Sequence, residues 1–327
     1  MTEILALATA NLLSPPVLFF ALGMAAGFLK SDLSFPDAVV KGMSLYLLLS
    51  IGFKGGVAAQ AHGLAGDFLR AVGVGLGLSL AMPLVVYAVM RGPGRLDRTN
   101  AGAVAAHYGS ISIVTFVAAM DFAGTAGLAP GKYLAAVAAI METPGIVAAL
   151  FLVARGAAAG SGKGPAFSGH LLREVLLNGS VVLLAGAFFV GLLTGAAGMK
   201  RLDLFVNGLF GGVLCLFLLE LGLTASRRLS GGGRLPTSLI VCGVALPLIG
   251  ATLGLIAARL CGVGPDDAAV LMTLGASSSY IAAPAAIRIA LPEADPGIYL
   301  PLSIGVTFPF NIAVGIPLYA GVARALL

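Results

Sequence analysis

The chain has 327 residues, of which 59% are hydrophobic and only 10% charged, and its mean hydropathy is +1.03. Soluble domains are about half apolar and about a quarter charged, so this composition excludes an ordinary soluble protein. Apolar runs of about 20 residues recur along the whole length, which is the pattern of a polytopic membrane protein. The net charge of +5 is therefore interpreted as membrane topology, and no nucleic-acid partner is expected.

The apolar runs predict ten membrane helices, in chain order. The first run lacks a basic segment before it and a cleavage site of small residues after it, so it is interpreted as a retained helix and not as a signal peptide. Stretches rich in Gly, Pro and charge, such as "RGPGRLDR" and "LPEADPG", separate the helices. The predicted ranges are 12–29, 38–57, 69–90, 101–120, 132–154, 174–196, 204–224, 238–260, 267–287 and 298–322.

These helices fall into two similar sets of five. "PGKYL" begins at Pro130 and "PGIYL" at Pro296, 166 residues later, and "AVAAHYGSIS" and "AVLMTLGASSS" begin at Ala103 and Ala269, with the same offset. Five is an odd number, so the second copy would enter the membrane upside down, as in the inverted repeats of secondary transporters. We expect a first repeat over 1–154, a cytoplasmic linker over 155–173 and a second repeat over 174–327.

The basic residues predict the orientation. The larger share of the 19 Lys and Arg residues, including Arg91, Arg155 and Arg234, falls on one side of the predicted membrane. The side richer in these residues is cytoplasmic by the positive-inside rule, so both termini are expected outside. The smaller share, including Lys54 and Lys132, is expected on the outer side.

Two glycine pairs occupy matching places in the predicted repeats. Gly23 and Gly27 belong to "GMAAG", and Gly191 and Gly195 belong to "GLLTG". Small residues four apart allow two membrane helices to approach closely. We therefore expect close helix contacts at both pairs, with no chemical role.

Polar residues interrupt the fourth and ninth apolar runs near their centres. Gly109, Ser110 and Ser112 lie in "HYGSISIVT", and three consecutive serines follow Ala276 in "GASSSY", with Pro284 beyond them. Non-helical backbone at membrane depth is tolerated where it is buried by protein or lines a wet cavity. Two facing breaks would offer N–H groups, helix dipoles and hydroxyls to a small anion with a cation beside it. The alternative is that small residues and serines only allow close helix packing.

A carboxylate in the fifth run is a second candidate. Glu142 lies near its centre, where an ionised carboxylate costs about 2.5–3.5 kcal/mol, so it is a candidate cation ligand or proton carrier. Thr307 and Asn311 occupy the matching part of the tenth run and could supply oxygen ligands. A protonated, hydrogen-bonded structural Glu142 remains the alternative.

Enzyme and metal motifs are not matched. In "GASSS" Ser279 stands where a nucleophile elbow needs its second glycine, and no H-E-x-x-H occurs. The three cysteines lie in apolar runs without ligand spacing. An intramembrane hydrolase built on Ser110 and His107 would lack a third group, and His107 is expected to be a packed histidine. We therefore expect no catalytic residues, no cofactor and no structural or catalytic metal.

Three segments together resemble the SbtA family of sodium-dependent bicarbonate permeases. They are "IGFKGG" (51–56), "AGAVAAHYGSISIVTF" (101–116) and "GASSSYIAAPAAIRIALPEADPGIYLPLSIGVTFPFNIAVGIPLY" (275–319), and the similarity extends over essentially the whole chain. The resemblance implies an all-α membrane fold with ten helices in inverted fives, discontinuous fourth and ninth helices, and core and gate domains. It also implies sodium-coupled bicarbonate uptake, a homotrimer and a PII-like cytoplasmic regulator.

The resemblance also points to the site. Where the family tends to have an acidic residue after the serine triplet, this chain has Tyr280. With the residues selected above, the expected substrate-binding set is Gly109, Ser110, Ser112, Ala276, Ser277, Ser278 and Ser279. The expected sodium-binding set is Thr115, Tyr280, Glu142, Thr307 and Asn311.

The sequence thus predicts a symporter of bicarbonate and sodium, working by alternating access in the inner membrane of a bacterium. Three alternatives remain open: a symporter of another small anion or carboxylate, a proton-coupled transporter that uses Glu142, and a passive anion channel.

Overall fold

The computed structural model describes residues 13–62, 66–161, 179–230, 235–280 and 282–327. Within these ranges the chain forms helices and no β-strand. Seven helical stretches of the described residues are long and apolar enough to cross a membrane. The prediction of a helical, multi-pass membrane protein is therefore confirmed, whereas the layout of ten helices in inverted repeats stays a prediction.

Several helices are long and continuous, because their apolar runs contain few residues that end a helix. Pro83, Pro144 and Pro247 lie inside three of them, and neighbouring helices allow such prolines in membranes. The continuous helices are α2 (Pro15–Phe28), α3 (Asp37–His62), α4 (Gly66–Arg91), α7 (Leu134–Ser161), α10 (Phe210–Ser230) and α11 (Thr237–Cys261). The span α9 (Gly179–Asp203) is kinked at Gly195, whose backbone is left-handed with a φ of 54°. The predicted linker 155–173 overlaps the end of α7, and 162–173 lies outside the described residues.

The fourth and ninth runs are each divided into two helices at the predicted serines. The fourth run forms α5 (Arg98–Gly109) and α6 (Ile113–Thr125), and the ninth forms α12 (Pro265–Ala276) and α13 (Ala282–Ala290). The last run consists of α14 (Pro296–Leu300), the π-helical η2 (Pro301–Thr307), α15 (Phe308–Phe310), the π-helical η3 (Asn311–Gly315) and α16 (Ile316–Leu326). A short π-helix, η1 (Leu204–Gly208), joins α9 to α10.

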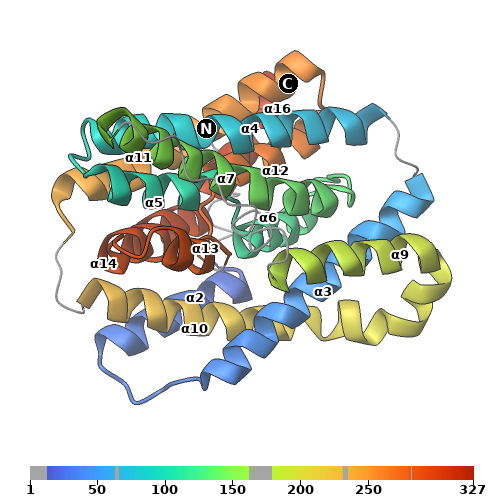
Figure 1. Ribbon diagram of the computed structural model, residues 1–327. Helices are drawn as coiled ribbons and strands as arrows, with labels where there is room; N and C mark the ends of the chain where they lie inside the picture. Colours follow the sequence, from blue (N-terminus) through green and yellow to red (C-terminus); the bar gives the residue numbers. More distant parts are fainter. Residues whose placement is uncertain (1–12, 63–65, 162–178, 231–234, 281) are drawn as a thin grey trace.

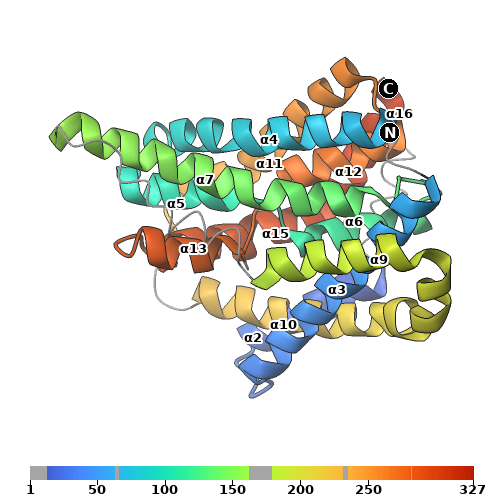
Figure 2. The same cartoon turned by 45° about the vertical axis from the view of Figure 1, so that its right-hand side comes forward.

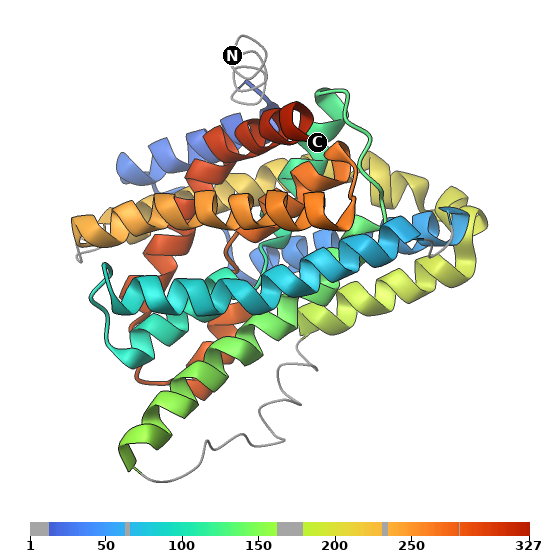
Figure 3. The same ribbon diagram turned by 90° about the horizontal axis from the view of Figure 1, so that it is seen from above.

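The helices form two groups, which Figures 1 and 2 show on opposite sides of the molecule. In the paired group α2 packs against α10 and α3 packs against α9. In the second group, which we call the break group, α4 packs on α5, α7 and α11, and α12 packs on α11 and α16. Seen from above, α4 lies between α11 and α7 (Figure 3). The long helices α4, α7 and α11 thus pack against the interrupted helices.

Glycines set the contacts inside the paired group. A Cβ atom on Gly23 would lie 2.0 Å from the carbonyl oxygen of Leu219, and one on Gly191 would lie 2.2 Å from that of Phe53. Each partner helix also contributes a glycine to the crossing. A Cβ atom on Gly222 would collide with the carbonyl oxygen of Phe20, and one on Gly56 would collide with that of Phe188. The expected close helix contacts at Gly23 and Gly191 are confirmed, and no larger residue fits at these crossings.

Candidate functional site

The break between α5 and α6 is fixed by close packing and by a helix cap. Gly145 of α7 presses on Gly109, because a Cβ atom on Gly145 would lie 2.0 Å from the Gly109 carbonyl oxygen. Ser110 and Ser112 have extended backbone, which ends α5. The Ser112 hydroxyl then accepts a hydrogen bond from the N–H of Thr115 at 3.1 Å, so Ser112 is the N-cap of α6.

The break between α12 and α13 has a similar construction. Ser277 ends α12 in extended conformation, and its hydroxyl donates to the carbonyl oxygen of Leu274 at 2.8 Å. The Ser279 hydroxyl accepts from the N–H of Ala283 at 3.2 Å and so caps the start of α13. At each break one serine therefore compensates for hydrogen bonds that the interrupted helix has lost.

The two breaks are hydrogen-bonded to each other. The Ser112 N–H donates to the Ser277 hydroxyl at 3.0 Å. The Ser279 N–H donates to the carbonyl oxygen of His107, at the end of α5, at 2.6 Å. Segments 165 residues apart in the sequence are thus joined in the interior of the protein, and the N-terminal ends of α6 and α13 both begin at this junction.

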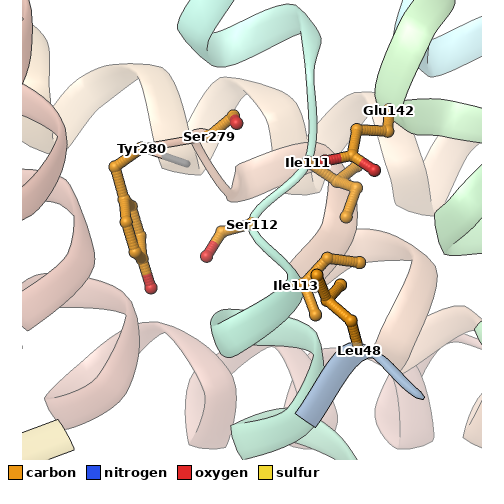
Figure 4. Close-up of a pocket in the computed structure, with 7 residues that line it drawn as sticks. All are labelled: Leu48, Ile111, Ser112, Ile113, Glu142, Ser279 and Tyr280. Carbon is orange, nitrogen blue, oxygen red and sulfur yellow. The ribbon is translucent and has the colours of Figure 1, made fainter. Parts of the chain in front are cut away.

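A small cavity of about 10 Å³ lies at the junction (Figure 4). Its volume suits one water molecule or one small cation. In Figure 4 the Ser112 hydroxyl lies between Tyr280 and Glu142, which approach from opposite sides of the α5–α6 connection. The lining residues are Leu48, Ile111, Ser112, Ile113, Glu142, Ser279 and Tyr280. Four predicted site residues therefore meet at one cavity.

Several buried polar atoms at the breaks have no hydrogen-bond partner. The hydroxyls of Ser110, Ser278 and Tyr280 and one carboxylate oxygen of Glu142 are in this state, although none of these residues is more than 9% exposed. Among the described residues three other side chains also have a buried polar atom without a partner, and one of these atoms is Nε2 of the adjacent His107. A buried polar group without a partner costs about 1–3 kcal/mol, and more if charged. Such a concentration is typical of a site that is completed by a ligand.

The remaining predicted residues are engaged by the protein itself. Asn311 donates through its side-chain nitrogen to the carbonyl oxygen of Ala276 at 2.8 Å and accepts from Tyr319 at 3.0 Å. Thr307 donates to the carbonyl oxygen of Gly243 at 2.7 Å and is also hydrogen-bonded to Tyr108. Neither Thr307 nor Asn311 lines the cavity, and both hold the last helix against its neighbours.

Three more predicted residues lie next to the cavity and not on it. The Thr115 N–H is used by the cap of α6, and the Gly109 and Ala276 carbonyl oxygens accept from other side chains. Together with Ser110, Ser277 and Ser278 they form the backbone and hydroxyl surroundings of the junction.

Sequence reasoning missed one positioning residue. The Ser79 hydroxyl of α4 is placed between the carbonyl oxygens of Met141, at 2.7 Å, and Gly109, at 3.2 Å, and so links α4, α5 and α7 next to Glu142. A single serine in an apolar helix gives no signal of this role. His107 is packed in the interior as expected, and its Nδ1 is 2.7 Å from the carbonyl oxygen of Ala103.

The chemistry of this site suits a hard cation and a small anion. Its ligand atoms are hydroxyl, carbonyl and carboxylate oxygens and backbone N–H groups, and half-helix ends at membrane depth bind such ions in transporters. No group of three His, Cys, Asp or Glu residues that could hold a metal ion occurs in the described part of the chain.

Fold and site together define a class: a helical membrane protein with two interrupted helices that face each other across an ion-sized cavity. The sequence matches the Na+-dependent bicarbonate transporter superfamily over residues 15–324, and the chain belongs to that family. A comparison with curated proteins gives no significant match. The match to the family confirms the resemblance inferred from the sequence.

Proposed function

We propose that the protein is a secondary active transporter that moves bicarbonate together with sodium across the membrane. The observation that carries the proposal is the group of unpartnered, buried oxygens where the two breaks meet. A stable fold retains such groups where a ligand completes their hydrogen bonds or neutralises their charge. Membership of the superfamily supports both bicarbonate and sodium as cargo.

The cation is assigned to the small cavity. Glu142 is 2% exposed and has one carboxylate oxygen without a partner, so a sodium ion beside it would offset the cost of a buried negative charge. The hydroxyls of Ser112, Ser279 and Tyr280 line the same space and would complete an oxygen coordination shell. The family tends to have an acidic residue after the serine triplet, where this chain has Tyr280. In this arrangement Glu142 supplies the missing carboxylate.

The anion is assigned to the space between the serines. Bicarbonate has several heavy atoms and is too large for a 10 Å³ cavity, so the breaks must separate slightly to admit it. The hydroxyls of Ser110 and Ser278 are free to donate to it. The first N–H groups of α6 and the positive end of its dipole would favour the negative charge.

The packing supports a ten-helix inverted repeat. The glycine contact of α2 with α10 has a counterpart in the contact of α9 with α3, and the helices correspond in the two predicted repeats. The division into a paired group and a break group supports the predicted gate and core domains. We propose that the break group carries both ions past the paired group, which gives alternating access. The predicted homotrimer, inner-membrane location, external termini and PII-like regulator belong to the same proposal.

The first experiment measures uptake of labelled bicarbonate into proteoliposomes, with an inward gradient of sodium or of potassium. We expect accumulation against the bicarbonate gradient with sodium only. Glu142→Gln should abolish the dependence on sodium, whereas Glu220→Gln, at a half-buried membrane glutamate hydrogen-bonded to Thr224, serves as the matched control.

The outcomes separate the alternatives. Uptake driven equally by a proton gradient, and lost in Glu142→Gln, would favour the proton-coupled transporter. Equilibration without accumulation would favour the passive channel. The absence of bicarbonate uptake by folded protein in either salt would refute the cargo, and other small carboxylates would be tested next.

A further inference from the structure

A second, larger cavity opens between the two helix groups. Its volume is about 480 Å³, within the range of small-molecule binding sites. It shares no lining residue with the small cavity at the breaks. It lies between α3, α6, the start of α7 and the junction of α9 with α10.

This cavity lies along the same two helices as the small cavity. Leu48 of α3 and Ile113 of α6 line the small cavity, and about one turn further along the same helices Ile51 and Phe116 line the large one. Ile51 is 4% exposed and Phe116 is 2% exposed, so apolar side chains separate the two spaces. We call the large cavity the vestibule, because it is placed in line with the breaks.

The vestibule carries a positive charge on a membrane helix. The ammonium nitrogen of Lys54 lies 4.1 Å from the centre of the Phe210 ring. A cation–π contact holds the side chain in place without neutralising it. Among the described residues no carboxylate lies within ion-pair distance of Lys54, since the one ion pair found there joins Arg70 to Asp67.

The other charges near the vestibule do not cancel that of Lys54. Lys132 and Asp121 also line the vestibule. Asp203 accepts a hydrogen bond from the lining residue Asn207 at 2.8 Å, and Lys200 and Arg201 precede it at the end of α9. Basic residues thus outnumber acidic ones around this space.

We propose that the vestibule is a capture site for a small monoanion, with Lys54 as its principal binding group and Lys132 as a secondary one. The inference rests on the proposed function and adds a step to it, since the anion would be held here before it reaches the serines. A positive charge in a partly desolvated cleft raises the local concentration of anions. The cation–π contact does not neutralise the ammonium group, so its charge stays available to the anion.

The first test measures the bicarbonate dependence of sodium-driven transport, as uptake and as efflux. Lys54→Gln should raise the KM for bicarbonate severalfold with kcat little changed, because it removes capture and leaves the break site intact. Lys54→Arg should restore a KM near that of the unmodified protein. Lys41→Gln, at an exposed lysine near the other end of α3, is the matched control. An unchanged KM for Lys54→Gln in both directions would overturn the proposal.

The second test does not depend on the cargo. Met120→Cys places a thiol on the vestibule wall of full-length protein in which Cys215, Cys242 and Cys261 are replaced by alanine. We expect an anionic methanethiosulfonate to react faster, relative to a cationic one, when Lys54 is present than in Lys54→Gln. A ratio that does not respond to Lys54 would overturn the capture site. If the ratio responds but the unmodified protein takes up no bicarbonate, the proposed function fails and the anion-attracting vestibule stands.

Discussion

The serines at the two breaks have different roles, although the sequence places them side by side. Ser112, Ser277 and Ser279 take part in hydrogen bonds within the protein, whereas Ser110 and Ser278 are buried with free hydroxyls. A hydroxyl that satisfies the backbone stabilises the fold, and a buried hydroxyl without a partner destabilises it unless a ligand binds there. The structure therefore separates the serines that stabilise the two breaks from the serines whose hydroxyls are free to donate to an anion.

The neighbouring serines 277 and 278 give a prediction at this scale. Ser277→Ala leaves the buried Ser112 N–H without its acceptor and should lower the free energy of unfolding by about 1–3 kcal/mol. Ser278→Ala removes a hydroxyl that bonds to nothing in the protein, so stability should be unchanged or slightly higher, while the affinity for bicarbonate should fall. Thermal unfolding in detergent and uptake kinetics measure the two effects. Equal destabilisation by both substitutions would contradict this division of roles.

At the scale of helices, small residues in an apolar run have two different consequences: a helix break in one place and a tight helix crossing in another. Where small residues are followed by serines, the hydroxyls cap new helix ends, as Ser112 caps α6. Where a lone glycine faces another helix, the backbones touch, as at Gly191 and Phe53. In α9 the local sequence alone does not distinguish a glycine that makes such a contact from one that does not.

Two glycines of α9 test this point. A methyl group at position 191 would collide with the backbone of α3, so Gly191→Ala should lower the free energy of unfolding by about 1–3 kcal/mol. Gly186 lies on the same helix, and a Cβ atom there would have no neighbour within 4 Å, so Gly186→Ala should be neutral or mildly stabilising. Denaturation monitored by circular dichroism would compare them. A neutral Gly191→Ala would show that α3 and α9 can separate without cost.

The sequence was sufficient for the helical class and for the two interruptions. Four of the residues that it selected, Ser112, Ser279, Tyr280 and Glu142, line one cavity, and their assignment to the anion or the cation stays a prediction. The sequence did not indicate that the side chains of Thr307 and Asn311 are occupied by Gly243 and Ala276. Nor did it indicate the π-helical turns 301–307 and 311–315, although Pro301 begins the first turn and Pro309 lies between the two, and neither proline has a backbone donor. These features depend on which helices become neighbours, and local patterns do not contain that information.

At the scale of the whole molecule, the two halves are held together by equivalent contacts. The Ala129 N–H donates to a carboxylate oxygen of Asp266 at 2.9 Å, and the Asp295 N–H donates to the side-chain oxygen of Asn100 at 2.8 Å. Asn100 and Asp266 lie 166 residues apart, as do Ala129 and Asp295, which is the offset of the predicted repeats. Each contact joins the first turn of one interrupted helix to the loop that follows the other.

The two contacts predict similar losses of stability when either one is removed. Asn100→Ala and Asp266→Ala should each lower the free energy of unfolding by about 1 kcal/mol. Because the two contacts are independent, the double substitution should cost the sum within about 0.5 kcal/mol. A thermal-unfolding cycle of the four proteins measures both statements. Unchanged stability in both single variants, or strong coupling between them, would show that these contacts do not hold the two halves together independently.

The crossed pairing of α2 with α10 and of α3 with α9 has a consequence for biosynthesis. The glycine-lined faces of α2 and α3 enter the membrane first, but the helices that cover them are synthesised only after α7 is complete. Such contacts between distant parts of a chain close late in folding. The nascent protein must therefore hold its first helices in lipid with their tightest surfaces unmatched, and it acquires its native packing only when the second half leaves the ribosome.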